Sequence, residues 1–240
     1  MEYVVMAGGK GTRANCPEKY IQKVLLKDKN GKSLIENTLE RQRLYAKESK
    51  VNLVTGFLHE QVVEEVRVYK GKYPEQRIEL KYNPEYEKGI LHSLNNAIKD
   101  INDSIVILNG DTYYSEETFK ILNEVAKSTL VVLPKTEQYQ DCIKINSKGG
   151  KILEIGKEIE NFQYISIGCL FLEKSHVDIV RRILKELLQE ETPRIKIWHG
   201  LINLLIERGE EIGIKEINDH ALYEVDTEED YQQFLKKDEK

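Results

Sequence analysis

The sequence of 240 residues contains only three cysteines, two methionines, one tryptophan and five prolines. Cys16, Cys142 and Cys169 are odd in number and far apart, so neither a disulfide framework nor a cysteine zinc site is expected. No apolar run approaches the roughly 20 residues that a membrane helix needs. The first residues carry no basic segment before an apolar one, so we expect no signal peptide and a cytoplasmic protein.

The charge balance also excludes some functions. The chain has 36 Lys and Arg against 41 Asp and Glu, a formal net charge of −5, which argues against general affinity for nucleic acid. Hydrophobic residues make up 40% of the chain, enough to build a core without disulfides. Because no linker, repeat or low-complexity segment interrupts the pattern, we expect one domain over residues 1–240.

Apolar strand-like runs alternate with helical patterns through the first part of the chain. Strands are expected at residues 3–7, 51–55, 77–82, 104–108 and 129–133, and helices at 33–46, 60–69, 91–98 and 116–126. This order predicts a three-layer α/β fold with a Rossmann-like, mostly parallel sheet and helices on both faces.

The pattern changes after Pro134. Short strands are expected at 142–145, 151–155 and 164–171, and Lys148-Gly149-Gly150 supplies a hairpin turn. These strands predict a small β-hairpin subregion. Helices at 175–190 and 197–207 and strands at 212–216 and 222–225 follow, and Thr227 is expected to cap a last helix.

The most informative segment is the loop Gly8-Gly9-Lys10-Gly11-Thr12-Arg13, directly after the first strand. Glycines allow backbone N–H groups to approach an anion closely. Lys10, Arg13 and Lys19 add positive charge to the same loop, so it suits a polyphosphate.

Other interpretations of this region are weaker. A Walker loop ending in Gly31-Lys32-Ser33 fails because Leu26 stands where its first glycine belongs. A dinucleotide fingerprint, Gly9-x-Gly11-x-x-Ala14, requires an immediate helix, which Asn15-Cys16-Pro17 interrupts. A simple glycine turn with solvated lysines remains open from the loop alone.

Two carboxylates lie at the carboxyl ends of predicted strands. Asp111 follows the strand at 104–108, and Asp226 follows the strand at 222–225. Open α/β sheets bind ligands at these ends, and carboxylate oxygens are ligands that Mg²⁺ prefers. Each acid alone fits a turn or a helix start, but together with the loop they predict a magnesium site.

In these segments the chain resembles the nucleotidyltransferases that join a phosphate-bearing small molecule to a nucleoside triphosphate. This family includes sugar-1-phosphate pyrophosphorylases and choline-phosphate-type cytidylyltransferases. The opening Gly9-Lys10-Gly11-Thr12-Arg13 and the segments Asn109-Gly110-Asp111 and Glu224-x-Asp226-Thr227-x-x-Asp230 match its phosphate loop and two metal segments. Lys19 matches its signature lysine, with Lys23 as the alternative because Glu18 separates Lys19 from Pro17.

The resemblance implies a role for each matched residue. The implied catalytic residues are Lys19, Arg13, Asp111 and Asp226. Two of these, Asp111 and Asp226, are also the implied Mg²⁺ ligands. Nucleotide binding is assigned to Ala7, Gly8, Gly9, Lys10, Gly11, Thr12, Asn83 and Ser93, within a nucleotide part at about residues 1–134. The acceptor part covers about residues 135–226.

Asn83-Pro84 and Ser93-Leu94 resemble the cytidylyltransferase branch, which implies CTP and a small phosphate- or phosphonate-bearing acceptor such as phosphocholine. The resemblance assigns Lys157 to the acceptor phosphate. The ammonium group of the acceptor is assigned to Tyr113, Tyr223 and Glu224, since aromatic faces and a carboxylate can hold an ammonium group. Tyr223 stands where this branch often has tryptophan, which leaves trimethylammonium specificity open.

Two other functions remain open from the sequence: a sugar-1-phosphate nucleotidyltransferase and a non-catalytic nucleotide-binding module. The resemblance also allows a homodimer, and it implies neither a nucleic-acid partner nor a membrane span.

Overall fold

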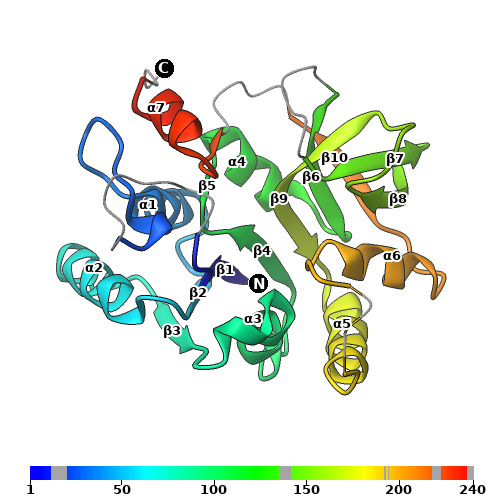
Figure 1. Ribbon diagram of the computed structural model, residues 1–240, viewed down its shortest axis with the longest axis horizontal. Helices are drawn as coiled ribbons and strands as arrows, with labels where there is room; N and C mark the ends of the chain where they lie inside the picture. The colour runs from blue at the N-terminus through cyan, green and yellow to red at the C-terminus, as the bar shows by residue number, and fades with distance from the viewer. Residues whose placement is uncertain (12–20, 136–141, 192, 194, 218–222, 237–240) are drawn as a thin grey trace.

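The computed structural model describes residues 1–11, 21–135, 142–191, 193, 195–217 and 223–236 (Figure 1). Its main element is a nine-stranded sheet in the order β3-β2-β1-β4-β9-β6-β10-β8-β7. The strands are β1 (Glu2–Ala7), β2 (Lys50–Thr55), β3 (Ile78–Tyr82), β4 (Ile105–Asn109), β6 (Thr129–Pro134), β7 (Lys144–Lys148), β8 (Lys151–Gly156), β9 (Tyr164–Leu172) and β10 (Gly213–Glu216). A separate two-stranded sheet pairs β5 (Thr112–Tyr113) with β11 (Tyr223–Glu224).

Strand direction divides the large sheet. Strands β3, β2, β1 and β4 pair in parallel, as the alternating sequence order predicts. Strand β9 is antiparallel to both β4 and β6, and β7 and β8 continue the antiparallel region. The α/β class with a mostly parallel sheet is confirmed, since seven of the nine strands run in one direction and only β8 and β9 run against them within the described residues. A buried apolar run such as β9 has the same composition in either direction, so the sequence pattern does not determine its orientation.

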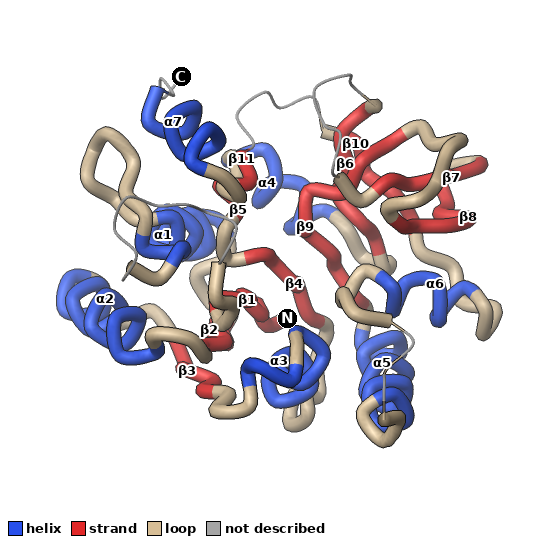
Figure 2. The backbone as a smooth tube through the Cα atoms, in the orientation of Figure 1, coloured by secondary structure: helices blue, strands red, loops and turns tan. Residues whose placement is uncertain are grey.

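Helices cover both faces of the sheet, which confirms the three-layer arrangement (Figure 2). One core cluster joins the sheet to α1 (Leu34–Tyr45), α2 (His59–Lys72) and α4 (Glu116–Glu124). The other joins it to α3 (Ile90–Ile98), α5 (Lys174–Leu187) and α6 (Gly200–Ile206). Strand β1 alternates between them, since Tyr3 and Val5 belong to the first cluster and Val4 to the second.

A third, smaller core holds the last helix, α7 (Glu228–Lys236), against the rest of the chain. It consists of Leu26, Leu34, Tyr113, Val225 and Phe234, which come from three stretches of the chain that are far apart in sequence. The start of α7 is fixed by Thr227, whose Oγ1 accepts from Asp230 N at 3.2 Å, as the sequence predicts. The carboxylate of Asp230 in turn accepts from the N–H groups of Asp226 and Thr227.

The predicted hairpin forms between β7 and β8, at the end of the sheet opposite β3 (Figure 1). Gly149 and Gly150 occupy its turn with φ of +60° and +76°. The short helices η1 (Lys23–Leu25) and η2 (Tyr86–Lys88) and strand β5 were not expected from the sequence. None of the helices in the described ranges has the length and apolarity that a membrane span needs.

Gly168 lies where β9 passes the end of β4. It has φ of +71°, and a Cβ there would overlap the side-chain amide of Asn109. Gly209 has a similar φ of +84°, but nothing lies within 4 Å of its missing Cβ. The two glycines therefore share a backbone conformation and differ in the space around them.

We expect Gly168→Ala to lower the free energy of unfolding by about 3 kcal/mol, because backbone strain and overlap with Asn109 both contribute. Gly209→Ala is the matched control and should cost about 1–2 kcal/mol from strain alone. Urea unfolding followed by circular dichroism measures both values. Equal losses in the two variants would show that the Asn109 contact adds nothing.

Candidate functional site

The centre of the site is an ion-pair cluster at the carboxyl ends of β4 and β11. The ammonium of Lys23 lies 2.7 Å from Oδ2 of Asp111 and 2.6 Å from Oδ1 of Asp226. The Lys23 side chain is only 10% exposed. Burial acts to lower the pKa of Lys23, but the negative charges of Asp111 and Asp226 outweigh it and raise the pKa above its usual value. Lys23 therefore stays positively charged.

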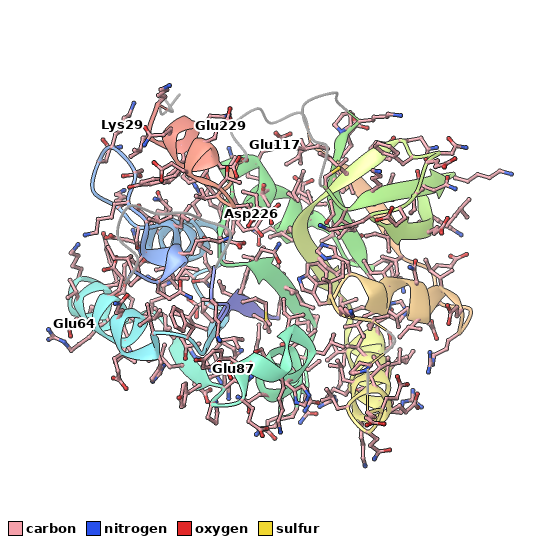
Figure 3. All side chains as sticks on the ribbon, in the orientation of Figure 1. Lys29, Glu64, Glu87, Glu117, Asp226 and Glu229 are labelled. Carbon is pink, nitrogen blue, oxygen red and sulfur yellow. The ribbon has the colours of Figure 1, made fainter. Side chains whose placement is uncertain are left out.

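The small β5–β11 sheet brings the two acids together. The pairing of Tyr223 with Tyr113 and of Glu224 with Thr112 continues into a hydrogen bond from Val225 N to Asp111 O of 3.0 Å. Asp226 follows immediately and lies toward the middle of the molecule, below α7 (Figure 3). The sequence predicted both acids at strand ends, but not that these two strands would pair with each other.

Glu224 adds a third carboxylate to this cluster. One ligand oxygen from each of Asp111, Glu224 and Asp226 lies within 4.8 Å of the others. With one ammonium among three carboxylates, the cluster has a net charge of −2. Hard oxygen donors with this excess of negative charge fit a divalent cation such as Mg²⁺.

A cavity of about 450 Å³ is lined by residues of this cluster. Its wall includes the glycine loop and Ser93, and also Lys157, the residue predicted to bind the acceptor phosphate, with Ser166 and His199. The predicted residues on its wall are Ala7, Gly8, Gly9, Lys10, Gly11, Ser93, Asp111, Lys157, Glu224 and Asp226. Thr12, Arg13 and Lys19 lie outside the described residues. The alternative signature lysine, Lys23, lines the cavity.

Asn83 is hydrogen-bonded to Ser93, a residue of the cavity wall. Its Nδ2 donates to Ser93 Oγ at 2.9 Å, and its Oδ1 accepts from Glu85 N at 3.0 Å. Asn83 is 5% exposed. Asn83, predicted to contact the nucleotide, is thus hydrogen-bonded to Ser93, which lines the cavity.

Tyr113 also differs from its predicted role at the acceptor. It is 3% exposed, packs against Phe234 below α7, and receives a hydrogen bond from Arg41 at its hydroxyl. Its ring therefore belongs to the core that docks α7. For Tyr223 the structure describes the backbone pairing with Tyr113.

The cavity wall that contains Trp198, Ser166 and His199 is held by a ring of hydrogen bonds that crosses from β4 to β9. Trp198 Nε1 donates to Asn109 Oδ1 at 3.0 Å, and the Tyr114 hydroxyl bridges Asn109 N and Gly168 O. Ser166 Oγ accepts from Gly168 N, and His199 Nε2 lies 3.0 Å from the same oxygen.

His199 is stacked on Trp198 in this ring. Burial lowers the pKa of His199 to about 3, so its ring is neutral at physiological pH. It offers a neutral hydrogen-bonding group to the cavity rather than a positive charge. Sequence reasoning missed this role because the histidines show no metal spacing and burial is a tertiary property.

The fold and the site define the nucleotidyltransferase class: an α/β sheet with a glycine loop, a lysine and clustered acids at its ligand-binding edge. Residues 3–191 match the family described as the MobA-like NTP transferase domain, and the chain belongs to this family. It is 26% identical over 217 residues to the bifunctional protein GlmU of Methanococcus maripaludis, which covers 90% of this chain. The chain spans about half of that relative, 49% of its length.

Solved structures share the fold across almost the whole chain. The CTP:phosphocholine cytidylyltransferase of Streptococcus pneumoniae superimposes with a TM-score of 0.78 at 19% identity, covering 98% of this chain and 97% of that one. A nucleoside-diphosphate-sugar pyrophosphorylase of Vibrio cholerae gives a TM-score of 0.80 at 17% identity, covering 98% and 100%. At these identities the likeness shows the fold alone.

Proposed function

We propose that the chain transfers a nucleotidyl group from a nucleoside triphosphate, with CTP favoured, to a small acceptor that bears a phosphate or phosphonate. The observation that carries this proposal is the meeting of Lys23, Asp111 and Asp226 between the glycine loop and Lys157. An acceptor oxygen forms a bond to the α-phosphorus, the bond from this phosphorus to the bridging oxygen breaks, and pyrophosphate leaves. The attacking oxygen is already anionic, so no protein base is needed.

Asp111 and Asp226 would hold the magnesium ion, which would supply charge neutralisation at the reacting phosphates, and the Glu224 carboxylate lies next to them. In the proposed reaction the glycine loop offers N–H groups to the triphosphate, and Lys157 holds the acceptor phosphate. The protein accelerates the transfer through positioning and charge rather than through a covalent intermediate.

Lys23 takes the role for which Lys19 was the first candidate. An ammonium group has three N–H donors. Two of them account for the contacts with Asp111 and Asp226, and the third is then available for an α-phosphate oxygen. The buried position of Lys23 between the metal ligands supports this assignment.

The orientation of Ser93 supports a base that carries a carbonyl group. Because Asn83 donates to Ser93 Oγ, the hydroxyl hydrogen of Ser93 is left to donate into the cavity. A donor at this position suits the O2 carbonyl of cytosine, which uracil and thymine share. Guanine also carries a carbonyl group, so this donor disfavours adenine alone, and the preference for CTP depends on the resemblance of Asn83-Pro84 and Ser93-Leu94 to the cytidylyltransferase branch.

The acceptor end supports a compact zwitterion such as phosphocholine. Lys157 supplies a cation for its phosphate, and Glu224 supplies a carboxylate for its ammonium group. Tyr113 and Trp198, at 3% and 1% exposed, do not present open ring faces. Recognition of the ammonium group therefore depends on Glu224 rather than on these two rings, and a primary ammonium acceptor fits as well.

A sugar-1-phosphate acceptor is the second candidate. It is favoured by the fold shared with a nucleoside-diphosphate-sugar pyrophosphorylase. The same lysine, carboxylates and loop would serve that reaction, so only the acceptor end of the cavity separates the two.

A substrate panel tests the proposal directly. CTP, UTP, dTTP and GTP are each combined with phosphocholine, phosphoethanolamine and glucose-1-phosphate, and pyrophosphate release is measured with Mg²⁺ and with excess EDTA. We expect Mg²⁺-dependent release to be fastest with CTP and a zwitterionic acceptor. Fastest release with glucose-1-phosphate would select the second candidate. Tight triphosphate binding without release from any pair would indicate a non-catalytic module.

Replacing Asp226 tests the metal site. We expect Asp226→Asn to lower turnover by about 10²–10³-fold, because a charged ligand is lost where phosphate charge must be balanced. Mn²⁺ binding, followed by electron paramagnetic resonance, should weaken in parallel. Glu229→Gln is the matched control, since Glu229 lies on α7 at the rim of the molecule (Figure 3). Unchanged Mn²⁺ affinity in Asp226→Asn would refute the metal assignment.

A comparison of two lysine variants tests the choice of signature lysine. Lys23→Ala should lower turnover by about 10²-fold or more, because the charge beside the reacting phosphate disappears. If Lys23 is the signature lysine, Lys19→Ala should retain activity within about tenfold. Steady-state rates at saturating Mg²⁺ give both values. A larger loss in Lys19→Ala would restore the first assignment.

A further inference from the structure

Gln22 lies directly before Lys23 and is almost completely buried, at 1% exposed. Its side-chain amide connects two parts of the site. Nε2 donates to the carbonyl oxygens of Ala7 at 2.9 Å and Gly9 at 3.1 Å, and Oε1 accepts from Val24 N at 2.7 Å. One side chain thus links the glycine loop to the short helix η1.

The backbone of Gln22 is held equally firmly. Its N–H donates to Oε1 of Gln61 on α2 at 2.9 Å, and its carbonyl oxygen accepts from Leu25 N at 2.8 Å. Every hydrogen-bonding group of Gln22 therefore has a partner within the described residues. Because Lys23 is the next residue and the first of η1, these bonds fix the backbone from which its side chain starts.

The same bonds orient the glycine loop. Gln22 engages the carbonyl oxygens of Ala7 and Gly9, and Phe57 N donates to the carbonyl oxygen of Gly8 at 3.1 Å. Carbonyl oxygens repel a polyphosphate, whereas peptide N–H groups attract it. Because these carbonyl oxygens accept hydrogen bonds from the protein, they are held away from an anion, and the N–H groups of the loop remain to bind it.

We propose that Gln22 is a positioning residue that couples the glycine loop to Lys23, so that the triphosphate and the lysine are placed by one amide. This inference rests on the proposed nucleotidyl transfer. It goes further, because it assigns a function to a buried neutral residue that contacts neither metal nor acceptor in the proposed arrangement.

Gln22→Met preserves side-chain length and removes the amide. We expect kcat to fall by about 10²-fold, because Lys23 is displaced. The KM for CTP should rise by about tenfold, because the loop loses its bound orientation, while the KM for phosphocholine stays within about twofold. Gln76→Met is the control: it removes an equally buried amide, 2% exposed, which donates to Leu39 O and Gln42 Oε1 and does not line the cavity, so all three constants should change less than about threefold.

A double-mutant cycle separates positioning from general destabilisation. If Gln22 acts on turnover through Lys23, then adding Gln22→Met to Lys23→Ala should lower kcat by less than about threefold. The loss in CTP affinity, measured by calorimetry, should persist in the double variant because it depends on the loop.

Two outcomes would overturn the coupling. One is a kcat and a CTP affinity for Gln22→Met within twofold of the wild type; the other is a full loss of kcat from Gln22→Met in the Lys23→Ala background. If the wild-type chain releases no pyrophosphate with any substrate pair, the proposed function fails instead. CTP calorimetry on Gln22→Met then still tests the loop contact alone.

Discussion

Like charges held at short range need a counter-charge, and the architecture of this chain depends on that constraint. Asp111, Glu224 and Asp226 are brought within 4.8 Å of one another, where their mutual repulsion would oppose folding. Lys23 offsets part of it from a buried position. The segments that carry these residues are far apart in sequence, so the site forms only when β4, η1 and the β5–β11 sheet are assembled.

The two halves of the sheet have different tasks at this centre. The parallel strands β3, β2, β1 and β4 end at the glycine loop and Asp111, and the region from β9 onward supplies the cavity wall at which the acceptor is proposed to bind. The ring through Asn109, Trp198, Tyr114 and Ser166 joins these halves without any formal charge. Neutral hydrogen bonds fix the geometry there, so the charged groups nearby remain available to the substrates.

Features that depend on local sequence were predictable. The glycine loop, Asp111 and Asp226 sit in short motifs, and the helix caps Ser33 and Thr227 follow from local chemistry. Tertiary features were not predictable in the same way. The direction of β9, the burial of Tyr113 and the support that Asn83 gives Ser93 depend on packing between distant segments. Gln22 belongs to this group, since only the fold places it at the cavity, whereas Lys23 was already the alternative signature lysine in the sequence.

The β5–β11 sheet has a further consequence for ligand affinity. It has two residues on each strand, and such short pairings are among the least stable units of a fold. Asp111 stands beside the rigid main sheet, whereas Glu224 and Asp226 depend on this pairing and on the docking of α7. For the proposed magnesium site, cation affinity would thus include the free energy of ordering the last segment, and local unfolding and metal release would be thermodynamically linked.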